Sequence, residues 1–230
     1  METTAPQSAA RDSRSDLSLC KWVALLAMSA DHVNKYMLSE HEPALFAFGR
    51  LAFPLFAAVL GLNLARSGLD SRARWRTIRR LAVVGAVAQI PFIGLGPVFV
   101  GWWPLNAMAS LLCVAIVVTM LERADWRGYF GAAAVFAVGG ALVEFWWPGL
   151  LIGIGAWLTA RGHGFRLLAW ASLGLGFMGI GWINDTHWAL LALPVVAVAR
   201  WLPQAPRAKW GFYAYYPLHL GLLWALRAIA

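Results

Sequence analysis

The sequence predicts an all-α protein, a polytopic integral membrane helix bundle of about nine transmembrane helices, within a range of about eight to ten. Of the 230 residues, 60% are hydrophobic and 13% are charged, whereas soluble domains are about half apolar and about a quarter charged. Apolar runs of about 20 residues, the length of a membrane-spanning helix, follow one another along the chain. Positive charges gather in alternate gaps between the runs, as expected for cytoplasmic loops.

The elements are expected in the following order. Residues 1–16 are polar and are expected to be a disordered cytoplasmic tail, and residues 17–230 a single membrane domain. The expected spans are 17–38, 44–66, 79–98, 104–122, 128–146, 148–160, 166–183, 187–202 and 209–229. The span 148–160 is short, so it is expected to tilt or to lie partly against its neighbours. Gly149 and Gly153 have the spacing that lets two helices approach closely.

Charge orients the bundle. Lysine and arginine in short loops stay in the cytoplasm, which places the N-terminus inside and, with nine spans, the C-terminus outside. The basic gaps hold Arg11, Arg14, Arg66, Arg72, Arg74, Arg76, Arg79, Arg80, Arg123, Arg127, Arg161, Arg166, Arg200, Arg207 and Lys209. The opposite gaps hold Glu40, Glu42 and Asp185, with Lys35 and Arg227 as the nearby cations. The net charge of +8 is therefore explained by topology and does not indicate nucleic-acid binding.

Other chemistries lack their motifs. The sequence has no GxxxxGK[ST] loop, which argues against an ATP-driven pump. Cys20 and Cys113 lie in or beside expected spans, so we expect neither a disulfide framework nor a metal site.

Ionisable groups inside the first span point to a function. Asp31, His32, Asn34 and Lys35 lie in its second half, and such groups are costly at bilayer depth unless they line a wet cavity or act on a ligand. Asp31, Asn34 and Lys35 share one helix face, whereas His32 points elsewhere, beside Tyr36. An ion pair between Asp31 and Lys35, with His32 as a packing residue, is the structural alternative.

The second and last spans carry further polar groups. Arg50 lies inside the second span, where it either reaches the outer interface or pairs with Asp31. Pro54 is expected to kink that helix. In the last span Tyr213, Tyr216 and His219 form one stripe, and His219 either takes part in proton transfer or caps a carbonyl freed by Pro217. Asn106 and Gln89 are weaker candidates, since each also suits a hydrogen bond at a helix end.

These residues, in this order, resemble the TraX family. The resemblance rests on Lys21, Asp31-His32, Gly49-Arg50, Phe53-Pro54-Leu55-Phe56, Arg79-Arg80-Leu81, Gln89-Ile90-Pro91-Phe92, Pro104-Leu105-Asn106, Phe212-Tyr213 and Tyr216-Pro217-Leu218-His219-Leu220. It covers almost the whole chain after the tail, and size and tryptophan content are similar to the TrbP branch. The resemblance implies a multi-pass enzyme of the bacterial inner membrane that acetylates the N-terminus of a conjugative pilin with acetyl-CoA, and a distant likeness to acyltransferase-3 membrane enzymes.

Joined to the polar residues, the resemblance implies roles. His32 is expected to be the general base, Asp31 to orient or stabilise its imidazolium, and Arg50 or Asn106 to hold the oxyanion. His219 completes the catalytic set. Lys35, Asn106, Tyr213 and Tyr216 are expected to bind substrate. The phosphates of acetyl-CoA are expected at Arg66, Arg72, Arg76, Arg79 and Arg80, for which cytoplasmic topology alone is the alternative explanation.

Other functions stay open. A sugar or lipid head group fits the same site as acetyl acceptor, and transfer through an acetyl-histidine is an alternative to direct transfer. A proton-coupled transporter also uses membrane Asp, His and Arg residues. The third alternative is an assembly subunit that only docks pilin. Pilin and membrane lipids are the expected partners.

Overall fold

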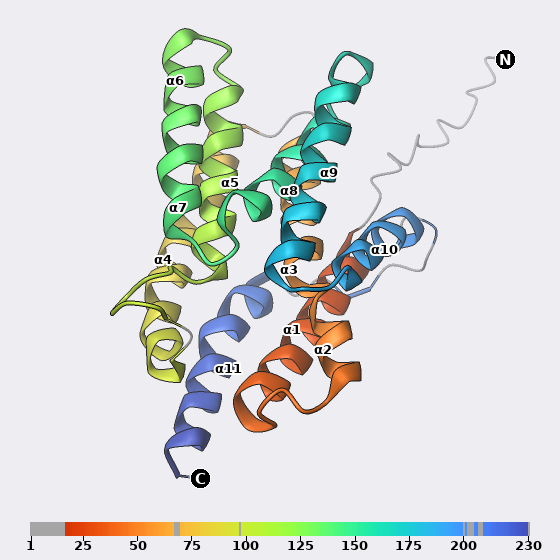
Figure 1. Cartoon of the computed structure of the whole chain (residues 1–230). Coiled ribbons are helices and arrows are strands. Elements are labelled where there is room, and N and C mark those ends of the chain that lie inside the picture. Colours follow the sequence, from red (N-terminus) through yellow and green to blue (C-terminus); the bar gives the residue numbers. More distant parts are fainter. Residues whose placement is uncertain are drawn as a thin grey trace, which may run out of the picture.

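The computed structural model of the chain describes residues 17–66, 70–96, 98–199, 201, 205–206 and 209–229, and the tail expected at 1–16 lies outside these ranges. Within them the fold is a bundle of helices (Figure 1). The helices are α1 (Ser18–Met37), α2 (Pro43–Gly49), α3 (Ala52–Leu64), α4 (Ser71–Leu95), α5 (Ala107–Leu121), α6 (Trp126–Ala134), the π-helix η1 (Val135–Gly139), α7 (Gly140–Leu142), α8 (Trp146–Thr159), the 3₁₀ turn η2 (His163–Phe165), α9 (Arg166–Ile183), the 3₁₀ turn η3 (Trp188–Leu191), α10 (Ala192–Ala199) and α11 (Lys209–Ile229). The predicted all-α class is confirmed.

Three helical segments are long and apolar enough to cross a membrane. They are Pro43–Leu64, which contains α2 and α3, Ser71–Leu95 and His163–Ile183. Ala107–Leu121 and Trp188–Ala199 are shorter apolar helices. These segments indicate a membrane protein. The helix bounds predicted at 166–183 and 209–229 agree with α9 and α11.

The span predicted at 44–66 is two helices, because the regular helix is interrupted at Arg50 and Leu51. The kink expected at Pro54 therefore lies earlier in the chain. A proline ring clashes with the carbonyl four residues before it and cannot donate to that carbonyl, and for Pro54 this is the carbonyl of Arg50. The proline thus frees the backbone at the position that carries the guanidinium.

Helix α4 begins eight residues before the predicted span 79–98, at Ser71. The Asp70 side chain accepts a hydrogen bond from the amide of Ala73 at 2.5 Å, which caps the helix. Arginine is also a good helix former. The arginine-rich loop expected there is therefore the first part of α4.

The span predicted at 128–146 ends early, at Leu142. Leu105 and Val143 form an isolated parallel bridge: the Leu105 amide donates to the Leu142 carbonyl at 2.8 Å, and the Glu144 amide donates to the Leu105 carbonyl at 2.9 Å. These bonds replace the next helical turn. Glu144 consequently lies outside the helices, in the connection between α7 and α8.

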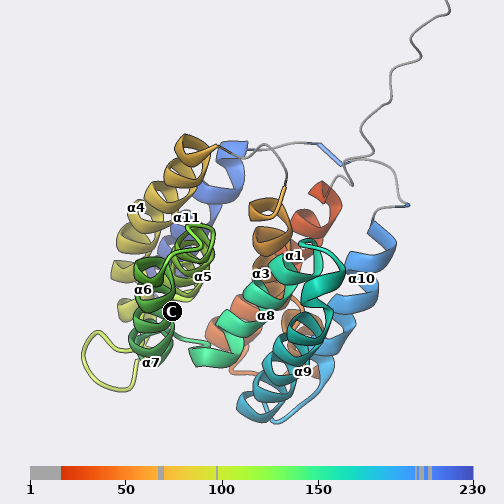
Figure 2. The same cartoon turned by 90° about the horizontal axis from the view of Figure 1, so that it is seen from above.

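Helices α3, α8 and α9 pack side by side (Figure 2). A β-carbon at Gly61 of α3 would collide with the carbonyl oxygen of Gly153 in α8. A β-carbon at Gly149 would lie 2.8 Å from the Phe53 ring. The close approach predicted from Gly149 and Gly153 is confirmed.

Helix α11 packs against both α4 and α1 (Figure 1). Gly94 of α4 lies against the Trp224 indole, and Arg227 donates to the Leu95 carbonyl at 2.6 Å at the end of α4. The last helix therefore lies beside the first, so that groups from the two ends of the chain meet.

Candidate functional site

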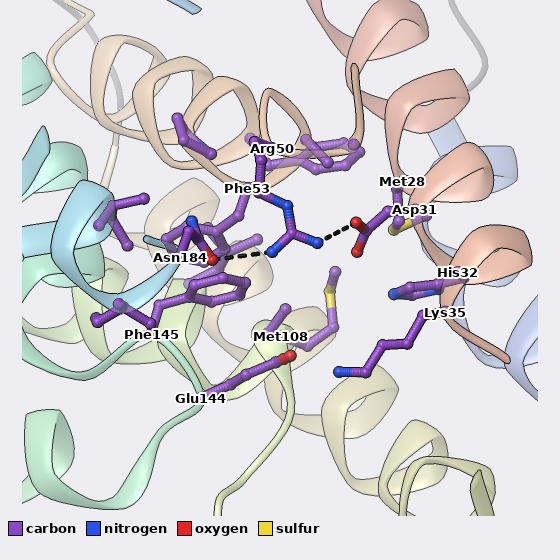
Figure 3. Close-up of a pocket in the computed structure, with 18 of the residues that line it drawn as sticks. Met28, Asp31, His32, Lys35, Arg50, Phe53, Met108, Glu144, Phe145 and Asn184 are labelled. Atoms are coloured by element: carbon purple, nitrogen blue, oxygen red, sulfur yellow. Dashed lines mark hydrogen bonds and ion pairs between the residues drawn. The ribbon is translucent and has the colours of Figure 1, made fainter. Parts of the chain in front are cut away.

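A cavity of about 200 Å³ lies where α1, α3, α5 and α11 meet the connections around Arg50, Glu144 and Asn184. Pockets for drug-sized molecules occupy about 300–1,000 Å³, so this one suits a small chemical group. Its polar lining consists of Asp31, His32, Lys35, Arg50, Glu144 and Asn184, together with Tyr216. Figure 3 shows these groups, except Tyr216, around one hollow.

Arg50 is held between two partners. One terminal nitrogen donates to the Asp31 carboxylate, and the other donates to Asn184 Oδ1 at 2.9 Å (Figure 3). The guanidinium carbon lies 4.4 Å from the Phe46 ring centroid. Since a guanidinium has five N–H donors, donors are left for a ligand. Nε is buried and has no hydrogen-bond partner among the described residues. The alternative in which Arg50 pairs with Asp31 is the arrangement observed.

His32 pairs with His219, not with Asp31. His32 Nδ1 lies 2.5 Å from His219 Nε2, and His219 Nδ1 lies 3.1 Å from the Tyr215 carbonyl oxygen. The carbonyl can only accept, so the proton of neutral His219 is on Nδ1 and its Nε2 accepts from His32 Nδ1. Nε2 of neutral His32 is therefore the nitrogen with a lone pair. Figure 3 shows a ring nitrogen of His32 facing the hollow.

Lys35 and Glu144 lie on the remaining walls, where the amino group and the carboxylate point toward each other (Figure 3). Burial raises the pKa of the Glu144 carboxyl to about 7; Lys35 opposes the shift, Asp31 adds to it and Arg50 opposes it. The Lys35 nitrogen also lies 5.7 Å from the Tyr36 ring centroid. A carboxylate and an ammonium thus face the same space as His32.

Of the other residues expected to bind substrate, Tyr216 lines the cavity, whereas Asn106 and Tyr213 lie outside its lining. Tyr216 is 2% exposed. Asn106 lies outside the lining and caps α5: its amide group donates to the Gly85 carbonyl at 2.8 Å and to Gln89 Oε1 at 2.7 Å, while Oδ1 accepts from the Met108 amide. The structure therefore gives Asn106 a role in joining α4 to α5.

Tyr213 also lies outside the lining, near a different cation. The Arg80 guanidinium carbon is 5.9 Å from its ring centroid and 4.6 Å from that of Trp210. The exposed arginines of the predicted donor site are Arg66, Arg72, Arg76 and Arg79. Gly85 packs against Met108 at the cavity, and at 1.5 Å per residue Arg80 and Arg72 lie about 8 Å and about 20 Å before it along α4.

A second polar cluster, the Glu122 cluster, consists of Arg74, Glu122, Trp157 and Arg161. The Glu122 carboxylate accepts from the Trp157 indole and from Arg161, both at 3.1 Å, and lies 3.6 Å from Arg74. It joins α4, α8 and the end of α5.

Across the described ranges, no group of three His, Cys, Asp or Glu side chains forms a potential metal site.

The profile of the TraX family, described as TraX protein, matches residues 16–227. The chain belongs to the TraX family. One curated relative, Protein TraX of Escherichia coli, is 36% identical over 131 residues, which is 56% of this chain and 47% of the relative. Protein TraX of Escherichia coli (strain K12) is 34% identical over 133 residues, with the same coverage. The chain spans about half the length of these TraX proteins. No solved structure matches it.

Two polar residues of this TraX cavity, Glu144 and Asn184, are not among the site residues that the sequence predicts. Glu144 lies within the apolar run 128–146, and a carboxylate in such a run is itself a sign of function. Asn184 directly follows the span 166–183, and nothing in the sequence separates it from an ordinary polar residue at a helix end.

Proposed function

We propose that this TraX-family chain is a membrane-embedded acetyltransferase. It moves an acetyl group from acetyl-CoA to the N-terminal amine of a conjugative pilin, in the inner membrane of a bacterium. The observation that carries the proposal is the shared cavity, in which the His32 imidazole and the Arg50 guanidinium face one small space. Acyl transfer needs a base for the nucleophile and hydrogen-bond donors for the developing oxyanion.

His32 is the proposed general base. Its Nε2 takes a proton from the acceptor nitrogen, while the Nδ1 proton stays bonded to His219. His219 is in turn fixed by the Tyr215 carbonyl. The orienting role that the sequence suggested for Asp31 is therefore proposed for His219.

Arg50 is the proposed oxyanion donor. Asp31 and Asn184 fix the guanidinium through two of its N–H groups, so that other donors can face the thioester oxygen without reorganising. The C–N bond forms between the thioester carbon and the acceptor nitrogen, and the C–S bond of the thioester breaks. The imidazolium of His32 returns a proton to the leaving thiolate. Direct transfer needs no further nucleophile in the cavity.

Acetyl-CoA supplies the acyl group, and the cavity has room only for that end of the molecule. We propose that the exposed Arg66, Arg72, Arg76 and Arg79 hold its phosphates, with Arg80 beside Trp210 nearer to the cavity. In the proposed topology, with about nine spans and the N-terminus inside, these arginines are cytoplasmic and the cavity lies toward the outer surface. Pilin enters between helices and presents its amine there.

The test is the intact mass of a pilin that is expressed with and without this chain in the same cells. We expect a mass increase of one acetyl group at the pilin N-terminus when the chain is present. Equal masses would contradict the acetyltransferase proposal. Consumption of acetyl-CoA by isolated membranes distinguishes it from a proton-coupled transporter, which leaves the thioester intact.

A further inference from the structure

Glu144 is fixed as a wall of the cavity by its backbone. Its amide donates to the Leu105 carbonyl at 2.9 Å, and the preceding residue, Val143, is extended and 1% exposed. In the π-helix η1 before it, the Ala137 carbonyl accepts from the Trp147 indole at 3.2 Å. The backbone around the helix end is therefore fixed by a main-chain bond at Glu144 and by the Trp147 indole at Ala137, and it carries the Glu144 side chain at the wall of the cavity.

The charges of the cavity are divided into two pairs. Asp31 forms an ion pair with Arg50. Glu144 faces Lys35, but the Lys35 nitrogen also lies 5.7 Å from the Tyr36 ring. If another cation approaches Glu144, Lys35 thus still has a second partner, the Tyr36 ring, through a cation–π contact. Glu144 is the acidic group of the cavity that can take a new cation without breaking the Arg50 pair.

The stoichiometry of acetyl transfer distinguishes an amine from a hydroxyl acceptor. An amine is an ammonium at neutral pH, and its nitrogen loses two protons when it becomes an amide. A hydroxyl oxygen loses one. One of these protons ends on the thiol sulfur of the leaving group. An ammonium acceptor must therefore release one further proton to another group. A second proton acceptor beside His32 is therefore needed for an amine and not for a hydroxyl.

We infer that Glu144 is a substrate-binding residue whose carboxylate holds the acceptor as an ammonium and takes its first proton. This inference rests on the proposed acetyltransferase function. The Glu144 carboxylate accepts one N–H proton and later releases it to water. The neutral amine attacks the thioester carbon, His32 takes the second proton, and the thiolate receives it. Glu144 thereby selects amines over the hydroxyls of sugars or lipid head groups. A pKa of about 7 suits this step, because the carboxylate can both gain and lose the proton at neutral pH.

The test compares two probe peptides in membrane vesicles that contain the full chain and acetyl-CoA with a labelled acetyl group. One peptide has a free α-amine, and the other has an α-hydroxyl in its place. Each is assayed as acceptor, and the hydroxyl peptide also as competitive inhibitor. For Glu144→Gln we expect the KM of the amine peptide to rise about tenfold to a hundredfold, as for the loss of a charge-assisted hydrogen bond. The constant with which the hydroxyl peptide inhibits Glu144→Gln should equal the constant for the wild type.

Three further variants sharpen the result. Lys35→Met removes the competing ammonium and should lower the KM of the amine peptide. Glu40→Gln makes the same chemical change on an exposed residue and should leave both constants unchanged. Glu144→Asp keeps the charge and should retain the preference for the amine. This variant tests the inference if the Glu144→Gln protein does not fold. Equal changes for both peptides, or no change, would overturn the inference. If the wild-type chain acetylates neither peptide, the proposed function fails and the inference with it.

Discussion

The cavity and the Glu122 cluster contain the same kinds of groups in opposite arrangements. In the Glu122 cluster one carboxylate receives Trp157, Arg161 and Arg74, so its polar groups point at one another. In the cavity Arg50 uses two of its donors on Asp31 and Asn184, and the remaining groups face a space of about 200 Å³. One arrangement is closed and the other is open.

The difference shows that charge inside a helix bundle does not by itself indicate function. The Glu122 cluster ties α4, α5 and α8 together, and its members lie outside the lining of the cavity. Its Arg74 Nε, like Arg50 Nε, is buried without a partner among the described residues, but it does not face the cavity. The cavity keeps unused donors and a nitrogen lone pair beside open space, which is the condition for binding a ligand. Substitutions in the cavity should therefore change the reaction, and substitutions in the Glu122 cluster should change stability.

His32→Ala should have the largest effect. It removes the proposed base, and general base catalysis contributes about 10²- to 10⁴-fold to a rate. We expect the initial rate of pilin acetylation to fall by that factor, with little change in the unfolding temperature. His41→Ala is the matched control, because His41 is exposed in the turn between α1 and α2. A His32→Ala chain that acetylates at the full rate would remove the base assignment.

Arg50→Lys tests the open arrangement with charge conserved. Lysine cannot bond Asp31 and Asn184 in a fork and also leave donors for an oxyanion, so the rate per folded molecule should fall about 10²- to 10³-fold. Arg161→Lys makes the same change in the Glu122 cluster. The Arg161 side chain is 40% exposed, so this control should change stability by less than about 1 kcal/mol and leave the rate unchanged. Equal loss of rate in both variants would contradict the comparison.

Glu122→Ala tests the closed arrangement. It leaves Arg74, whose side chain is 18% exposed, without its carboxylate. Breaking a buried pair costs about 3–5 kcal/mol, and partial exposure of the arginines lowers the expected loss of unfolding free energy to about 2 kcal/mol. Denaturant unfolding in detergent measures this loss, with Glu40→Ala as the exposed control. The acetylation rate of the molecules that stay folded should not change.

The apolar runs predicted the helices well at α9 and α11, whose bounds agree with the expected spans 166–183 and 209–229. It failed where backbone bonds decide the boundary. Asp70 caps α4 within an arginine-rich stretch that hydropathy predicts as a loop, and the bridge between Leu105 and Val143 ends α7 inside an apolar run. Both boundaries depend on hydrogen bonds that apolar runs do not reveal.

The site was predictable in its parts, and the Asp31–Arg50 pair was one of the expected alternatives, but the partner of His32 was not predictable. The cost of ionisable groups in a membrane identified Asp31, His32 and Arg50, which the structure brings to one cavity. The pairing of His32 with His219 depends on where α11 packs, and helix order in space is not encoded in spacing. Asn106 was expected near the oxyanion, yet its amide is used between α4 and α5.

The smallest expected effect is a dependence of stability on pH that only the open arrangement should show. Burial raises the pKa of Glu144 to about 7 from the ordinary 4.5 of a glutamate side chain, so the folded chain binds a proton more tightly than the unfolded chain. The stabilising contribution of this group is complete below pH 4.5 and is lost as the pH rises through about 7. Glutamine stays neutral throughout. The unfolding temperature of Glu144→Gln should therefore exceed that of the wild type by a difference that grows between these pH values and then stays constant, at about 2–4 °C for each kcal/mol of unfolding free energy. Glu40→Gln should give a flat difference, and a flat difference for Glu144→Gln would show that its carboxyl is solvated like an exposed one.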